Sequence, residues 1–389
     1  MGARVYGLVL VALVSAVLLM LTLNTAATFT APSANPSNQV ATATLATSTG
    51  VSAAVQANGG TVRIAWTPTS SSWASGHRVY RSTTSGSGYV QVTQIAGLGT
   101  ATFDDVPGTG TYYYVMRGYY NANGANWESA SSAEVIAKPL HHFAFAAIGT
   151  RVTGGAFNVT VTAQAQDNST VTAFTGTVAL STATGTISPS TSSAFTAGVL
   201  TQSVAIVAPQ TASETITATG GTPSRTGTSA AFTLDRFKAT AIALQNGATT
   251  AGRVQNTDRI VITFNAPVTT STIGTCGGAI DSGTDLKFNQ GQNAANDTVT
   301  GSGTRLSIGS IDLGGQGYMQ NNDTADASTC VWTSGNTVLT ITLAGIATAN
   351  TATIASAKTA SYTPNAAIQN AGGASIDTTA KPSVTAVLF

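Results

Sequence analysis

The chain has 389 residues, of which 42% are apolar and only 8% charged, and its formal net charge is +1. An average soluble domain carries about 25% charged residues. No basic run is present, and because phosphate binding needs clustered Lys and Arg, a nucleic-acid partner is not expected. The apolar content suffices for cores, which excludes a disordered chain of the high-charge type. At roughly 100–200 residues per domain, the length predicts two to four domains.

An uncharged apolar run covers residues 5–23 and follows Arg4. Small residues come next at Thr25, Ala26 and Ala27, so residues 1–27 are predicted to be a signal peptide for export. The run is also just long enough to span a bilayer as a helix, and a retained N-terminal anchor stays open. We expect membrane contact only through residues 5–23, if they are not cleaved. Both interpretations place the rest of the chain outside the cytoplasm.

Residues 28–50 are predicted to be an extended N-terminal segment. The stretch reads Ala-Thr-Phe-Thr from Ala27, then an Asn-rich turn, then Ala-Thr-Leu ending at Leu45. It resembles the start of alternate-signal-peptide exported proteins of the camelysin and biofilm-matrix type. The resemblance implies export and, in some members, assembly into fibres; an extended linker is the alternative. The part after Asn38 is expected to pair with a sheet edge, of its own chain or of a neighbouring subunit.

Residues 51–138 form the first predicted β unit. Apolar and polar side chains alternate at 61–67 and 76–82, and a long aromatic strand is predicted at 111–120. Short strands bounded by turn residues are typical of a β-sandwich.

Four stretches of this unit resemble a fibronectin type III domain: Trp66, Val79-Tyr-Arg81, Phe103-Asp-Asp105 and Tyr112-Tyr-Tyr-Val115. The resemblance implies structural roles for Trp66, on the second strand, and for Tyr112, a tyrosine corner whose hydroxyl is tied back to the backbone. His77 departs from the family pattern, and we expect it to be half-buried and hydrogen-bonded.

Residues 139–235 form the second predicted unit. Its strands are expected at 157–163, 171–180, 194–200, 215–218 and 231–234. Their sequences resemble bacterial immunoglobulin-like repeats of the invasin and intimin type, which implies a spacer. His141 and His142 are expected in a linker, where adjacent side chains point to opposite faces and do not share a metal.

Residues 236–389 form the third predicted unit. The strand-like runs at 259–268 and 337–343 and the closing segment 367–382 resemble the Ig-like domains of bacterial S-layer proteins. The unit is longer than that family's norm, with an insertion at about 274–332 that carries both cysteines.

Cys276 and Cys330 should form a disulfide in an oxidising compartment. Inert core thiols are the alternative, and a metal site is not expected from two cysteines without a neighbouring His. The insertion is rich in Asp, Asn and Gly, which supply the oxygen ligands of calcium. No Asp-x-Asp-x-Asp-Gly register is present, so a solvated loop is favoured over a calcium site.

The sequence therefore predicts an all-β chain of tandem immunoglobulin-like β-sandwiches after an N-terminal hydrophobic helix. It is expected to be an exported structural or adhesive protein of the cell surface or matrix, non-catalytic and without a cofactor. Expected partners are further copies of itself or other surface polymers. The alternative is an accessory protein that binds carbohydrate or tethers an activity encoded elsewhere, for which Trp73, Trp127 and Tyr119 are the candidate side chains.

Overall fold

The computed structural model describes residues 43–122, 125–274, 276 and 285–389. The expectations for residues 1–27, including the hydrophobic helix, and for most of 28–50 lie outside the described residues. Residues Leu45–Phe389 form one compact unit. Its regular structure is almost entirely β, with two single-turn 3-10 helices at Thr270–Thr272 and Thr348–Asn350. No helix of the described part has the length and apolarity to cross a membrane.

A first hydrophobic cluster lies between two sheets, one of order β1-β2-β5 and one of order β4-β3-β6-β7 with β8 also on β6. Alternation along β2 buries Val62, Ile64 and Trp66 and leaves Arg63 exposed and Ala65 partly exposed between them, as the period of two in a strand requires. The strands are β1 (Thr49–Val55), β2 (Val62–Thr67), β3 (Gly76–Ser82), β4 (Val90–Ala96), β5 (Thr102–Asp105), β6 (Tyr112–Ala122), β7 (Ala125–Glu128) and β8 (Val135–Ala137).

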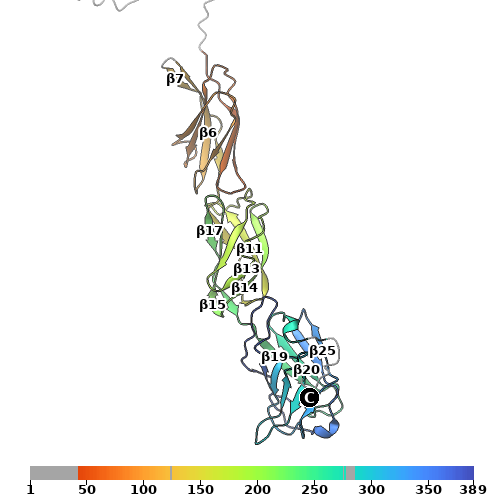
Figure 1. Ribbon diagram of the computed structural model, residues 1–389. Helices are drawn as coiled ribbons and strands as arrows, with labels where there is room; N and C mark the ends of the chain where they lie inside the picture. Colours follow the sequence, from red (N-terminus) through yellow and green to blue (C-terminus); the bar gives the residue numbers. More distant parts are fainter. Residues whose placement is uncertain (1–42, 123–124, 275, 277–284) are drawn as a thin grey trace, which may run out of the picture. The chain divides into compact units, whose positions relative to one another are not determined.

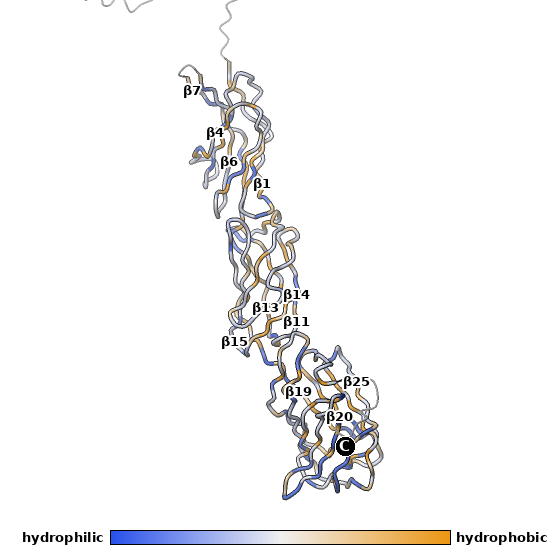
Figure 2. Tube along the Cα trace, viewed as in Figure 1, coloured by the Kyte–Doolittle hydropathy of each residue, from blue (hydrophilic) through white to orange (hydrophobic). Residues whose placement is uncertain are grey.

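A second cluster is built from the β9–β18 region, in sheets of order β13-β14-β11-β9, β12-β16-β17 and β10-β18-β15. Figure 2 shows apolar residues along strands such as β14, with paler or hydrophilic residues in the loops. The strands are β9 (His142–Phe145), β10 (Arg151–Val152), β11 (Ala156–Gln164), β12 (Val178–Thr182), β13 (Thr186–Ser188), β14 (Val199–Val207), β15 (Thr211–Glu214), β16 (Ile216–Gly220), β17 (Arg225–Thr228) and β18 (Phe232–Asp235).

The third cluster lies between a sheet of order β19-β20-β26-β25 and a six-stranded sheet of order β24-β21-β22-β23-β27-β28. Figure 1 shows β19, β20 and β25 in this part of the chain. The strands are β19 (Ala239–Gln245), β20 (Arg259–Phe264), β21 (Lys287–Asn289), β22 (Thr298–Gly301), β23 (Gly309–Asp312), β24 (Asp323–Thr324), β25 (Thr329–Thr333), β26 (Val338–Thr342), β27 (Ser361–Pro364) and β28 (Lys381–Pro382).

The described part of the stretch 274–332 is not a solvated loop, which corrects that expectation. It supplies β21, β22 and β23, which pair with one another and with β27. Phe288, Val299 and Ile311 on these strands have no exposed surface and belong to the third cluster. The sequence hides this because the strands have only three or four residues each, too few to show a period of two among Asn and Gly residues.

Serine side chains complete the backbone pairing where strands end. In each case the serine N–H donates to the carbonyl of a facing residue, and the serine Oγ accepts the N–H of that same residue. The Oγ–H then donates to the carbonyl of the next residue along the chain. The serine–facing residue pairs are Ser129–Gly118, Ser132–Met116, Ser192–Val178, Ser229–Ile216 and Ser383–Ala360.

A buried backbone group without a partner costs free energy. Where the ladder of strand hydrogen bonds stops, each of these five serines still gives the facing N–H group an acceptor. Ser229, for example, stands between β17 and β18, which belong to different sheets.

The loop 56–61 joins the first cluster to the second through backbone hydrogen bonds. The carbonyls of Ala57, Asn58 and Gly59 accept the N–H groups of Thr175, Thr222 and Leu140, at 3.2, 3.0 and 2.7 Å. The Asn58 Oδ1 shapes the loop by accepting the N–H of residues 60 and 61. A Cβ on Gly60 would lie 2.2 Å from the carbonyl oxygen of Thr222, so only glycine fits there.

A second such contact joins Asn370, which is 1% exposed, to residue 153. The Asn370 Nδ2 donates to the Thr153 carbonyl at 2.5 Å, while its Oδ1 accepts the N–H of Gly372 and Ala374. One amide side chain therefore both shapes the closing loop of the third cluster and binds the backbone of the second.

We expect Ser229→Ala to lower the free energy of unfolding by about 1–3 kcal/mol, because the N–H of the fully buried Ile216 loses its acceptor. Urea unfolding followed by circular dichroism measures the change. Ser224→Ala, at an exposed serine five residues earlier, is the matched control and should stay within about 0.5 kcal/mol of the parent chain. Equal stability of the two variants would contradict the role assigned to the serine hydroxyl.

Candidate functional site

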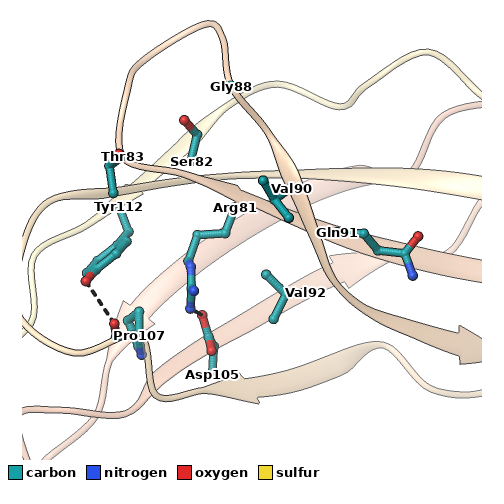
Figure 3. A pocket seen from close by; sticks show the side chains of 10 residues that line it. All are labelled: Arg81, Ser82, Thr83, Gly88, Val90, Gln91, Val92, Asp105, Pro107 and Tyr112. Atoms are coloured by element: carbon teal, nitrogen blue, oxygen red, sulfur yellow. Dashed lines mark hydrogen bonds and ion pairs between the residues drawn. The ribbon is translucent and has the colours of Figure 1, made fainter.

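A groove of about 710 Å³ opens on the first cluster between the edge strand β4 and the turn after β5. Figure 3 shows Val90 and Val92 along one side, and Asp105, Pro107 and Tyr112 along the other, with Arg81 between them. Val90 is 71% exposed, whereas Asp105 and Tyr112 are buried. The groove is therefore an open one with an apolar rim.

The charged groups of this groove satisfy one another. Arg81 Nη1 lies 2.7 Å from Asp105 Oδ2, and the Tyr114 hydroxyl donates to the same oxygen at 2.8 Å. Burial raises the pKa of the Tyr114 hydroxyl, and the neighbouring Asp105 carboxylate raises it further. Burial tends to lower the pKa of Arg81, but the hydrogen bond and charge of Asp105 outweigh it and raise that pKa. Both groups are thus held in fixed protonation states, which suits a structural ion pair better than acid–base chemistry.

Tyr112 stands at the start of β6 with its ring beneath Arg81, whose Cζ lies 5.3 Å from the ring centroid. The hydroxyl lies 2.8 Å from the carbonyl oxygens of both Pro107 and Thr109. The side chain thus ties the turn between β5 and β6 back onto the strand, as in a tyrosine corner.

Trp66 on β2 is 5% exposed and packs in the first cluster. Its ring centroid is 5.6 Å from that of His77, with the two planes tilted by 59°.

His77 is fully buried rather than half-buried, because its place on β3 faces the core beside Trp66. Its Nε2 accepts the N–H of Thr69 at 3.2 Å, and its Nδ1 is buried without a partner among the described residues. This geometry assigns the proton to Nδ1. Burial lowers the pKa of the imidazole, so the ring is neutral in the folded chain at neutral pH.

Cys276 and Cys330 form a disulfide with their Cα atoms 5.0 Å apart. Cys330 is buried on β25, an edge strand, and Cys276 lies against the third cluster. The two cysteines are 54 positions apart in the sequence, and for a loop of this length the chain-entropy model gives about 4 kcal/mol of stabilisation. It fastens the start of the 274–332 stretch to the opposite sheet.

His141 and His142 face each other, contrary to the expectation of opposite faces. Their Nδ1 atoms are 3.0 Å apart and their rings meet edge to face. Strand alternation does not apply because β9 begins only at His142. Over the described residues, no group of three or more His, Cys, Asp or Glu side chains gathers as metal ligands would.

The aspartates of the 274–332 stretch organise loops. Asp297 is fully buried and accepts the N–H groups of Gly291 and Met319 at 2.7 and 2.9 Å. Asp312 binds the side chain of Asn296 and the N–H of Gly314. Asp281 lies outside the described residues. The oxygens that calcium would need are thus largely engaged with nearby donors.

Of the three aromatic candidates for carbohydrate binding, the structure brings two together and buries the third. Tyr119 is 3% exposed beneath Arg78, whose Cζ lies 4.6 Å from its ring centroid, so it presents no surface to a ligand. Trp73 and Trp127 do come together, with ring centroids 6.5 Å apart, and Tyr120 lies between them at 5.4 and 5.5 Å. The sequence could have selected Tyr120 only with the register of β6, since the two tyrosines are neighbours and point to opposite faces.

No protein-family model and no curated protein match the chain. The solved structures that resemble it are fibronectin type III-like, surface-layer and other immunoglobulin-type proteins. A Fn3-like protein from Clostridium thermocellum is 29% identical over 24% of this chain and 92% of its own, with a TM-score of 0.21.

Domains 4–9 of the surface layer protein SbsC are 15% identical over 87% of this chain and 48% of their own, with a TM-score of 0.22. Three N-terminal domains of the bacteriophage RB49 outer capsid protein Hoc are 11% identical over 86% and 97%, with a TM-score of 0.25. At such scores these likenesses carry no argument about function.

We expect the stability of the chain to fall as the pH drops below about 6.5. His77 is then protonated in the unfolded chain, whereas burial lowers its pKa and keeps it neutral in the folded chain. The slope contributed by this one group is at most about 1.4 kcal/mol per pH unit. It should vanish in His77→Gln, whose amide oxygen can still accept the Thr69 N–H. Unfolding midpoints between pH 7.5 and 5 test this; an unchanged slope in the variant would refute it, and His142→Gln is the control.

Proposed function

We propose that the chain is an exported protein of the cell surface or extracellular matrix with a structural or adhesive role. The observation that carries the proposal is the Cys276–Cys330 disulfide. Disulfides persist in oxidising compartments and are rare in the cytosol. The apolar run at residues 5–23 gives the route of export, as a signal peptide ending near residue 27 or as a retained anchor.

The three hydrophobic clusters support an organisation into three domains, 51–138, 139–235 and 236–389. On this proposal the second is a spacer of the invasin and intimin type and the third is of the S-layer type. The N-terminal segment 28–50 joins the first domain to the exported end, in the manner of camelysin-type proteins.

The proposal assigns no catalytic step to the chain. The most deeply buried carboxylates are used to hold loops: Glu214 accepts the N–H groups of Ala183 and Thr184, and Asp258 those of Gly247 and Gln255. Burial raises the pKa of Asp258, against the backbone donors that lower it. Such carboxylates satisfy the orphan amides of turns, which is a structural use.

Self-association or contact with other surface polymers fits the exposed strand edges. Edge strand β4 reads Val-Gln-Val-Thr-Gln-Ile-Ala, has no charge, and is mostly exposed or half-buried. Charges and prolines commonly block such edges; β4 has neither, and its pairing with β3 is interrupted by a bulge at Val92. A near-neutral chain also has little long-range repulsion to keep copies apart.

The proposal predicts that the chain is recovered outside the cytoplasm with no free thiol. Cell fractionation into cytoplasm, envelope and medium, followed by alkylation with a thiol-reactive polyethylene glycol, tests both points. Reduced chain confined to the cytoplasm would refute export. The Cys276→Ser/Cys330→Ser double variant gives the mobility of a chain that cannot react.

The assembly part of the proposal predicts that the mature protein forms larger species that depend on residues 28–45. Size-exclusion chromatography and negative-stain microscopy of the mature chain, with and without that segment, measure this. If both forms remain monomeric at high concentration, assembly fails and a monomeric surface spacer becomes the better description.

A further inference from the structure

Three aromatic side chains form a patch on the first cluster, defined here as Trp73, Tyr120 and Trp127. Trp73 lies in the connection from β2 to β3, whereas Tyr120 on β6 and Trp127 on β7 are cross-strand partners in one hairpin. The Tyr120 and Trp127 ring planes are tilted by only 33°, and Trp73 meets both edge-on, at 69° and 85°. Trp127 is 55% exposed, so the patch turns a ring surface to solvent.

The polar ends of these rings are unused. Trp73 Nε1, Trp127 Nε1 and the Tyr120 hydroxyl make no hydrogen bond with any of the described residues. Buried Tyr and Trp usually find a partner for their polar atom. The rings of the patch are instead partly or mostly exposed, and neither the Trp73 Nε1 nor the Tyr120 hydroxyl is buried. The patch therefore combines apolar ring faces with three hydrogen-bonding groups that are free to contact a ligand.

The opposite face of the same hairpin is held in place by charge. Glu128 on β7 pairs with Arg78 at 2.6 Å and with Arg117 at 2.9 Å, and it also accepts the Tyr80 hydroxyl. Arg78 Nη2 donates to the neighbouring Asn126 at 3.0 Å. Because side chains alternate along β7, these contacts fix the strand without touching Trp127. The patch is thus positioned before any ligand arrives, which lowers the entropic cost of binding.

The size and charge of the patch decide what fits it. A buried Tyr or Trp covers about 150–250 Å², so with two of the rings half-buried the patch exposes less than about 400 Å². A stable protein partner needs about 800 Å² from each side, which is at least twice that area. No charged group belongs to the patch, and Glu128, the residue after Trp127, is engaged with Arg78 and Arg117.

From this geometry we infer that the patch binds the sugar rings of a neutral polysaccharide. A pyranose ring presents an apolar face of C–H groups to Trp127 and hydroxyl oxygens as acceptors for the indole N–H groups. One or two sugar units match the exposed area. The inference rests on the proposed surface location, because it names the polymer that such a protein would hold.

The test uses the full mature chain and defined probes. Cellohexaose, laminarihexaose and N-acetylchitohexaose are titrated by calorimetry, with intrinsic tryptophan fluorescence as a second readout, and oligogalacturonate is the charged counterpart. We expect one neutral oligosaccharide to bind and to change the fluorescence. Trp127→Ala should weaken that binding by about tenfold or more, as expected when a central aromatic contact is truncated. Trp127→Phe should restore part of it.

Ile136→Ala is the matched control, because Ile136 is an exposed apolar side chain on β8, which pairs with the opposite end of β6 from β7. It should leave the affinity unchanged, and circular dichroism of every variant reports the fold. Absence of binding to all three neutral probes, equal affinity in Trp127→Ala, or preference for oligogalacturonate would each overturn the inference. Loss of self-association instead of sugar binding in Trp127→Ala would assign the patch to a second copy and overturn it as well. None of these outcomes affects the fractionation result, so the two proposals fail separately.

Discussion

The pairing of backbone amides where strands end is the constraint on which this molecule depends. A chain of many short strands has many ends, and each end exposes N–H and C=O groups that must find partners. With only 8% charged residues, the chain meets much of this need with small neutral groups. Five serines pair with both backbone groups of a facing residue, and each hydroxyl donates a hydrogen bond to the next carbonyl along the chain. Asn58 and Asn370 do similar work in the loops that connect the clusters.

The low content of charged residues also determines which groups are available for recognition at the surface. Most of the carboxylates are committed, either to arginines, as Asp105 is to Arg81, or to loop amides, as Asp297 is to Gly291 and Met319. The groups of the patch without partners are aromatic and weakly polar: Tyr120 and Trp127 on a hairpin whose other face carries the Glu128 ion pairs, and Trp73 beside them. Recognition by such a chain depends on ring faces and single hydrogen bonds rather than on charge. That is consistent with a neutral ligand.

Sequence patterns predicted the all-β class and the strand at 61–67, which is β2 of the structure, because alternation over six or more residues is a strong signal. They did less well where apolar residues are buried outside strands. The run 171–180 is a strand only from Val178, yet Val171 and Phe174 are buried because they cover one end of the second cluster.

The opposite error was made at β21 to β23, which are strands in the structure but were predicted to be part of a loop insertion, because each has only three or four residues. Individual choices such as Tyr120 over Tyr119, or Ser229 among many serines, depend on register, which a composition rich in Ser and Thr does not specify.

The disulfide has a mechanical consequence for the third cluster under tension. If tension pulls the third cluster apart, the 53 residues between Cys276 and Cys330 cannot extend, because the covalent bond carries the load across them. At about 3.4 Å per extended residue, roughly 180 Å of chain stays hidden. The domain would then lengthen less when it unfolds under force, and strands β21 to β24 would stay close together for refolding when the force is released. A covalent staple of this kind limits stretch as well as unfolding.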